Sequence, residues 1–197
     1  MSEFCQEKEG IYRLKIPFDT VYTSVFLIVT EEKRILVDCA ATSSDVDIHI
    51  AEACRRLGYP LSEINTLVLT HRHGDHAGGK ARISELAPTI EIVTDVRELT
   101  DQVSTYPMAG HTEDCIGVLD TRTNTLLSGD SIQGAGVDKY RLALESKTAY
   151  QKTLERLKND QRIENILFSH AYEPWYCDRV EGRESVLRCL EECEKYL

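Results

Sequence analysis

The stretch Thr70-His71-Arg72-His73-Gly74-Asp75-His76 contains three of the six histidines of this 197-residue chain. It directly follows the apolar residues 67–69, which predict a short buried strand. Imidazole is the commonest protein metal ligand near neutral pH, and a rigid strand end fixes the loop that follows it. A lone histidine is more often a surface or core residue, whereas three histidines and an aspartate in one loop predict a metal site.

Three further candidate ligands lie near the ends of predicted elements. His111 occurs in the sequence Gly-His-Thr, Asp130 follows an apolar run at residues 125–128, and His170 follows another at 163–168. Each is a weak indication by itself, and for Asp130 alone a turn-capping role is the simpler interpretation. Together with the first stretch, they predict a site for two metal ions.

The remaining sequence predicts an α/β domain. Helices are expected at residues 45–57, capped by Ser44 and ended by Gly58, at 79–87, over the apolar face that includes Leu154, and at the C-terminus. Because strands alternate with helices and also form hairpin-like pairs, one domain with mixed sheets is expected over residues 1–197. The expected strands are residues 11–15, 21–29, 34–39, 65–70, 90–94, 116–120, 125–128 and 163–168.

The composition and charge argue against several classes of protein. The chain has 23 Lys and Arg and 33 Asp and Glu, a net charge of −10, and short basic pairs such as Lys33 with Arg34 make no nucleic-acid-binding patch. No apolar run reaches the roughly 18 residues of a membrane span, and the first ten residues are too polar and acidic for a secretory signal. Seven cysteines without a C-x-x-C pair predict reduced thiols, with Cys189 and Cys193 on an apolar helix stripe. We therefore expect a cytoplasmic protein whose partner is a small molecule, not nucleic acid or a membrane.

The order and spacing of these motifs resemble the metallo-β-lactamase superfamily. The first stretch, Gly-His-Thr, Ser-Gly-Asp and Ser-His follow one another as in that family, over about residues 10–171. The resemblance implies a four-layer αββα sandwich made of two similar halves with mixed sheets. It implies a first ion held by His71, His73 and His111, a second held by Asp75, His76 and His170, and Asp130 bridging both.

Other residues near these motifs are compared with the same family. Asp38 resembles the family's acidic residue at a strand end, which hydrogen-bonds to a ligand histidine from outside the coordination sphere of the metal. It is followed by Cys39-Ala40, where the family usually has Thr-Gly, so this turn is expected to differ. His49 has no counterpart and is interpreted as structural or solvated. Tyr172 and Trp175 either wall a substrate pocket or pack in the core.

A larger departure concerns the region between the first two motifs. Only 34 residues separate His76 from His111 (111 − 76 − 1), fewer than in many relatives. The polar residues 95–105 cannot hold the extra hairpin that those relatives carry. His170 is followed by Ala171, where the family usually has Gly. We expect the substrate entrance to differ and the metal ligands to be kept.

The resemblance also implies a reaction. Two divalent ions, Zn²⁺ with Fe or Mn as alternatives, hold a hydroxide that cleaves an ester-like bond, either a thioester or a lactone. Asp75 and Asp130 orient the hydroxide and carry its proton. Tyr140 donates to the oxyanion, as tyrosines do in some lactone-cleaving relatives. The chain is similar in type to short, single-domain glyoxalase II-like hydrolases, and the 27 residues after His170 leave room for one helix but not for a glutathione-binding domain.

Several alternatives differ from this hydrolase in sequence. Secreted β-lactamases commonly have Cys at the position of Asp130, and RNase Z-like nucleases need a basic surface or an RNA-gripping insertion. The oxygen-reducing diiron branch carries Glu at the position of His73 and a flavin domain. Two alternatives stay open: a persulfide dioxygenase, which keeps all seven ligands but uses a single iron, and a non-catalytic metal-binding module.

Overall fold

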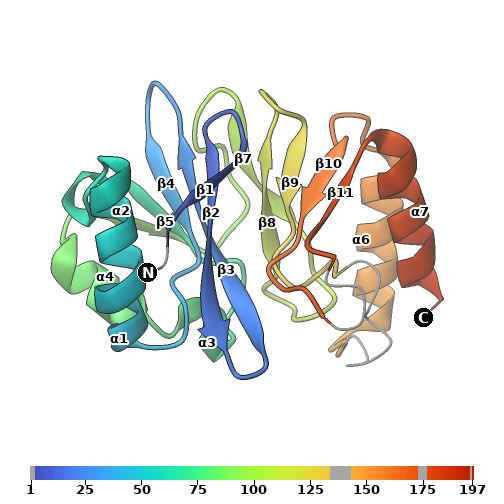
Figure 1. Cartoon of the computed structure of the whole chain (residues 1–197). Coiled ribbons are helices and arrows are strands. Elements are labelled where there is room, and N and C mark those ends of the chain that lie inside the picture. Colours follow the sequence, from blue (N-terminus) through green and yellow to red (C-terminus); the bar gives the residue numbers. More distant parts are fainter. Residues whose placement is uncertain (1–2, 134–142, 173–176, 196) are drawn as a thin grey trace. The chain divides into compact units, whose positions relative to one another are not determined.

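The computed structural model describes residues 3–133, 143–172, 177–195 and 197. The chain divides into two compact units, Met1–Thr94 and Asp95–Leu197. Each unit is built on one mixed sheet with helices on one side of it (Figure 1).

The first unit contains a six-stranded sheet in the order β1-β2-β3-β4-β5-β6. Strands β1 to β4 pair antiparallel, and β4, β5 and β6 are parallel neighbours. The predicted strands are confirmed, whereas β1 was not predicted because its polar sequence shows no apolar alternation. The strands are β1 (Cys5–Lys8), β2 (Ile11–Phe18), β3 (Val21–Val29), β4 (Arg34–Val37), β5 (Thr66–Val68) and β6 (Glu91–Val93).

One longer helix of this unit is continuous but irregular: α1 (Ser43–Asp45), the π-helical turn η1 (Val46–Ala51) and α2 (Glu52–Leu57). The predicted end is confirmed, because Gly58 adopts the left-handed conformation with φ 89°. The predicted cap is wrong. Thr42 caps the helix and forms a reciprocal capping box with Asp45. The sequence pattern of a hydroxyl residue followed three residues later by Asp fits both Thr42 and Ser44, so it does not discriminate between them.

Short helices complete the first unit, and its core lies between helices and sheet. Residues Val46 and Ile50 pack in one buried cluster with Leu27, Leu36 and Leu67 from the strands. The short helices are η2 (Leu61–Glu63, a 3₁₀ turn), α3 (Gly74–Ala77) and α4 (Lys80–Leu86).

The second unit contains a five-stranded sheet in the order β11-β10-β9-β8-β7. Strands β9 and β10 are parallel, and the other neighbours are antiparallel. Residues 95–102 lead into β7, which was not predicted, and an isolated antiparallel bridge between Glu98 and Ser104 closes the turn before this strand. The elements are β7 (Val103–Pro107), β8 (Ile116–Asp120), β9 (Thr125–Leu127), α6 (Lys147–Asn159), β10 (Asn165–Leu167), β11 (Arg179–Glu181) and α7 (Arg183–Glu194).

Helices α6 and α7 lie side by side against this second sheet (Figure 1). Tyr150 and Leu154 of α6 share a buried cluster with Cys189, Leu190 and Cys193 of α7. The two cysteines therefore lie on the apolar stripe, as predicted, and all seven cysteines of the chain are free thiols. None of the helices in the described part of the chain has the length and apolar character that a membrane crossing needs.

Candidate metal centre

In the first unit, the predicted ligands follow the carboxyl end of strand β5. This strand and β4 are parallel and end at paired residues, Val68 and Val37, so the segments that follow them leave the sheet at the same edge. The His71 side chain is buried just after β5. Helix α3 then carries Asp75 and the fully buried His76.

Asp38, the first residue after β4, connects this loop to the sheet. Its carboxylate accepts hydrogen bonds from the Thr70 amide at 2.8 Å, from the Thr70 hydroxyl at 2.9 Å and from Nδ1 of His76 at 2.7 Å. Because the Thr70 hydroxyl has a single proton and gives it to Asp38, its oxygen accepts from Nδ1 of His71 at 3.1 Å. Both histidines are thereby held with the proton on Nδ1 and the lone pair on Nε2.

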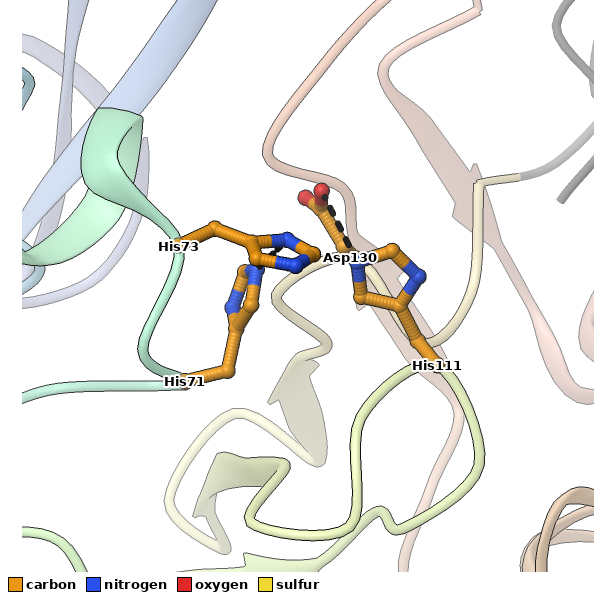
Figure 2. Close-up of side chains that lie close together, drawn as sticks. All are labelled: His71, His73, His111 and Asp130. Atoms are coloured by element: carbon orange, nitrogen blue, oxygen red, sulfur yellow. Dashed lines mark hydrogen bonds and ion pairs between the residues drawn. The ribbon is translucent and has the colours of Figure 1, made fainter. Parts of the chain in front are cut away.

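His71 and His73 face one another, as Figure 2 shows. Nε2 of His71 lies 3.0 Å from Nδ1 of His73. Two imidazole nitrogens that share a tetrahedral zinc ion at the usual bond length of about 2.0–2.1 Å lie about 3.3 Å apart. The spacing of this pair is thus close to that of two ligands of one ion.

The Asp75 carboxylate lies between two groups of the same unit. Its Oδ2 is 3.3 Å from Nε2 of His76 and accepts a hydrogen bond of 3.2 Å from the Thr23 hydroxyl. Thr23 is a buried residue of β3. Sequence reasoning missed it, although Thr23 and Ser24 are hydroxyl residues in the otherwise apolar and aromatic run of that strand.

In the second unit, the structure brings His111, Asp130 and His170 together. Oδ1 of Asp130 lies 3.2 Å from Nε2 of His170. Its Oδ2 lies 3.7 Å from Nε2 of His111, and Figure 2 draws this pair. All three are buried, with at most 7% of each residue exposed. Asp130 and His170 follow the parallel neighbours β9 and β10, so they too lie at one edge of their sheet.

The start of helix α6 and the residues before it hold the His111 loop. The carbonyl oxygen of Ala143 accepts a 2.7 Å hydrogen bond from Nδ1 of His111, which leaves the lone pair on Nε2. The Ser146 amide donates to the carbonyl of Gly110. A Cβ atom on Gly110 would lie 2.6 Å from Cβ of Tyr150, so the loop approaches the helix too closely for any side chain at this position.

Two buried thiols lie beside these loops. The Cys39 thiol donates a 3.2 Å hydrogen bond to the carbonyl of His76, and burial raises the pKa of this thiol to about 12. The sulfur of Cys115 is 3.0 Å from the Thr112 hydroxyl, next to His111, and burial raises its pKa as well. Both thiols are therefore protonated at neutral pH, and neither is a thiolate in this structure.

The structure describes two of the remaining residues discussed from the sequence, Tyr172 and His49. The ring centroid of Tyr172 lies 5.6 Å from that of His170. His49 is a half-buried residue of η1 and belongs to neither donor group. Tyr140 and Trp175 fall outside the described residues.

The protonation of the histidines tests whether a metal fits. In neutral imidazoles with the proton on Nδ1, the Nε2 lone pairs of His76 and His111 face carboxylate oxygens of Asp75 and Asp130. Lone pair and carboxylate repel one another unless a cation lies with them. A divalent cation therefore fits both donor groups, and imidazole with carboxylate suits zinc, iron and manganese.

Comparisons with known proteins place the chain in a family. The sequence model of the metallo-β-lactamase superfamily matches residues 18–99. A solved metallo-β-lactamase structure from Erythrobacter litoralis, with beta mercaptoethanol in its active site, matches with a TM-score of 0.74 at 22% identity. That match covers 98% of this chain and 96% of the other. The chain belongs to the metallo-β-lactamase superfamily. The predicted α/β class with mixed sheets is confirmed, and the chain has the metallo-β-lactamase fold.

Two relatives of this metallo-β-lactamase superfamily member have different names. It is 31% identical over 164 residues to the "Beta-lactamase-like protein 2 homolog" of Drosophila melanogaster, covering 68% of this chain and 54% of that protein. It is 23% identical over 160 residues to the "Atrochrysone carboxyl ACP thioesterase" of Passalora fulva, covering 71% and 45%. The chain thus spans about half the length of these relatives. It is a superfamily member with histidine and aspartate donor groups.

Proposed function

We propose that this chain is a metal-dependent hydrolase that cleaves an ester-like bond, a thioester or a lactone, in a small molecule. The observation that carries the proposal is the set of buried imidazoles whose Nε2 atoms lie within 3.7 Å of carboxylate oxygens of Asp75 and Asp130. A relative named as a thioesterase supports the ester-like substrate class.

The proposed ligands form two groups. Histidine nitrogens would predominate among the ligands of the first ion, and the second ion would have one more carboxylate ligand than the first. Zn²⁺ is the proposed metal, with Fe or Mn as alternatives that suit the same ligands. Two divalent ions bound there would lower the pKa of a bound water to about 7 and would polarise a substrate carbonyl. As the resemblance implies, His71, His73 and His111 would hold the first ion and Asp75, His76 and His170 the second, and Asp130 would be a ligand of both.

The residues of the chain contribute orientation and proton transfer. Asp38, directly and through Thr70, keeps the lone pairs of His71 and His76 on Nε2. Asp75 is only partly buried, so its carboxylate can accept a proton from water and pass it to solvent. The Thr23 hydroxyl keeps Oδ2 of Asp75 in place during that transfer. Tyr140 remains the proposed donor to the oxyanion.

Metal analysis and turnover test the proposal together. Protein purified without added metal is expected to contain about two zinc or manganese ions per chain by elemental mass spectrometry. We expect it to hydrolyse members of a thioester and lactone panel, to lose this activity on chelation and to regain it with zinc. His170→Ala is expected to lower kcat/KM at least about 100-fold. His49→Ala is the matched control and is expected to keep the wild-type rate.

Other outcomes would overturn the proposal. A folded His170→Ala protein with full activity would contradict the assigned ligands. About one iron per chain, with oxygen consumption in the presence of a persulfide, would establish the dioxygenase alternative instead. Bound metal without turnover of any ester-like substrate would support the alternative of a non-catalytic metal-binding module.

A further inference from the structure

The turn after strand β4 has an unusual backbone. Asp38 has φ 65° and Ala40 has φ 60°, so two non-glycine residues within three positions occupy the left-handed region. This region is unfavourable for residues with a side chain and persists where surrounding contacts determine it. Both residues and Cys39 between them are almost fully buried.

The contacts of this turn converge on one residue, His76. The Cys39 amide donates a 2.8 Å hydrogen bond to the carbonyl oxygen of His76, and the Cys39 thiol donates to the same oxygen at 3.2 Å. Asp38 accepts from Nδ1 of the His76 ring at 2.7 Å. The carbonyl groups at the end of a helix have no partner within it, and α3 is only four residues long, so the turn supplies donors that the helix lacks.

The residues after α3 are shaped to receive the turn. A Cβ on Gly78 would lie 2.0 Å from the carbonyl oxygen of Ala41, and one on Gly79 would lie 2.1 Å from that of Cys39. The Gly79 amide donates to the carbonyl of Ala40 at 3.2 Å. The turn and the ligand-bearing segment are therefore in direct backbone contact.

We propose that Cys39 is a positioning residue for His76: its amide and thiol together fix the His76 carbonyl, and thereby the direction from which the ring reaches the metal. This inference rests on the proposed function, in which His76 is a ligand. A thiol suits the position because it packs as an apolar side chain in the buried cluster and also acts as a weak donor. Alanine or valine keeps the first property and loses the second.

Cys54 provides the matched control. It is also buried in the same cluster, on α2, and burial likewise raises the pKa of its thiol to about 12. Replacing it removes an equivalent buried thiol without touching the turn after β4. A role of Cys39 in core packing alone predicts the same result at both positions, whereas a positioning role predicts different results.

The test compares zinc affinity, the cobalt spectrum and stability in the full-length variants. Zinc affinity is measured by competition with a chromophoric chelator, and the cobalt(II)-substituted proteins by visible absorption. Cys39→Ala is expected to bind the weaker of two zinc ions about 10-fold less tightly and to shift the cobalt bands. Cys39→Ser keeps a donor and is expected to restore most of the affinity. Cys54→Ala is expected to lower thermal stability and leave both zinc affinities and the cobalt spectrum unchanged. Cys39→Val, which fills the space without a donor, replaces Cys39→Ala if that variant does not fold.

The outcomes separate this inference from the proposed function. If the wild type binds two ions and hydrolyses its substrate, but Cys39→Ala binds zinc equally well, only the role of Cys39 is overturned. The same conclusion follows if Cys39→Ser is no better than Cys39→Ala. If the wild type binds neither zinc nor cobalt, the proposed function fails and the inference fails with it.

Discussion

At the scale of single residues, the Asp38 side chain connects three groups around the predicted metal ligands of the first unit. Its two oxygens accept from an amide, a hydroxyl and an imidazole, all within 2.9 Å. Asp38 orients the His76 imidazole directly, and it orients the His71 imidazole through the Thr70 hydroxyl. A carboxylate suits the position because it only accepts, so every donor that reaches it is satisfied.

Asp38→Asn tests this role. The asparagine amide keeps one accepting oxygen, but its nitrogen must donate toward groups that also donate, so either Thr70 or His76 loses its acceptor. Zinc affinity is expected to fall about 10- to 100-fold. Asp47→Asn, at a surface residue that pairs with Arg82, is the control and is expected to bind zinc as the wild type does. Competition with a chelator measures the zinc affinity of both variants. Equal affinity of Asp38→Asn and the wild type would show that Asp38 does not orient the metal ligands.

At the scale of elements, both units place ligands in the same way. His71, Asp130 and His170 are each the third residue after the end of a strand, β5, β9 and β10 respectively. Each of these strands has a parallel neighbour, and the carboxyl ends of parallel strands meet at one sheet edge. Short buried strands thus supply the rigidity that the ligand-bearing loops lack.

Glycines permit the close approach at these loops, and Gly78 allows a direct test. Gly78→Ala places Cβ 2.0 Å from a backbone oxygen, which a side-chain rotation cannot relieve. We expect it to lower the free energy of unfolding by about 1–3 kcal/mol. Gly74→Ala, four residues earlier, meets no described atom within 4 Å and is expected to change stability by less than about 1 kcal/mol. Urea unfolding of the two variants decides this, and equal stabilities would contradict the steric argument.

The sequence predicted these elements where its pattern was strong. Apolar runs such as β8, followed or preceded by turn formers, were found within a few residues of their bounds. Strands β1, β7 and β11 were missed because they are short, partly polar and defined by pairing rather than by their own sequence. Within the candidate site, the sequence predicted mainly the histidine and aspartate side chains that can bind a metal. Among the partners that orient these side chains, Asp38 was expected from the resemblance. A backbone carbonyl such as that of Ala143 escaped notice, because it leaves no signal in the sequence.

At the scale of the whole molecule, bound metal is expected to increase the free energy of unfolding. Each unit contributes imidazoles and carboxylates whose repulsion a cation relieves. A ligand that binds only the folded state at 100 times its dissociation constant adds about 2.7 kcal/mol. For a chain of this size, that raises the melting temperature by about 5–10 °C.

Calorimetry with and without metal measures this contribution. Treatment with a chelator is expected to lower the melting temperature by that amount, and added zinc is expected to restore it. In His71→Ala the zinc-dependent shift is expected to be smaller, while in His49→Ala it stays at the wild-type value. An unchanged melting temperature after complete removal of metal from the wild type would show that the donor groups are stable without a cation.

The seven free thiols can serve as natural probes of local opening in this protein. Cys39 and Cys54 are buried in the first unit, Cys115, Cys189 and Cys193 in the second, and Cys5 is exposed. An alkylating reagent reaches a buried sulfur only when the surrounding structure opens, so its labelling rate reports the free energy of that opening. Mass spectrometry of the alkylated peptides therefore resolves which unit opens first, with Cys5 as the fully accessible reference, and no probe has to be introduced.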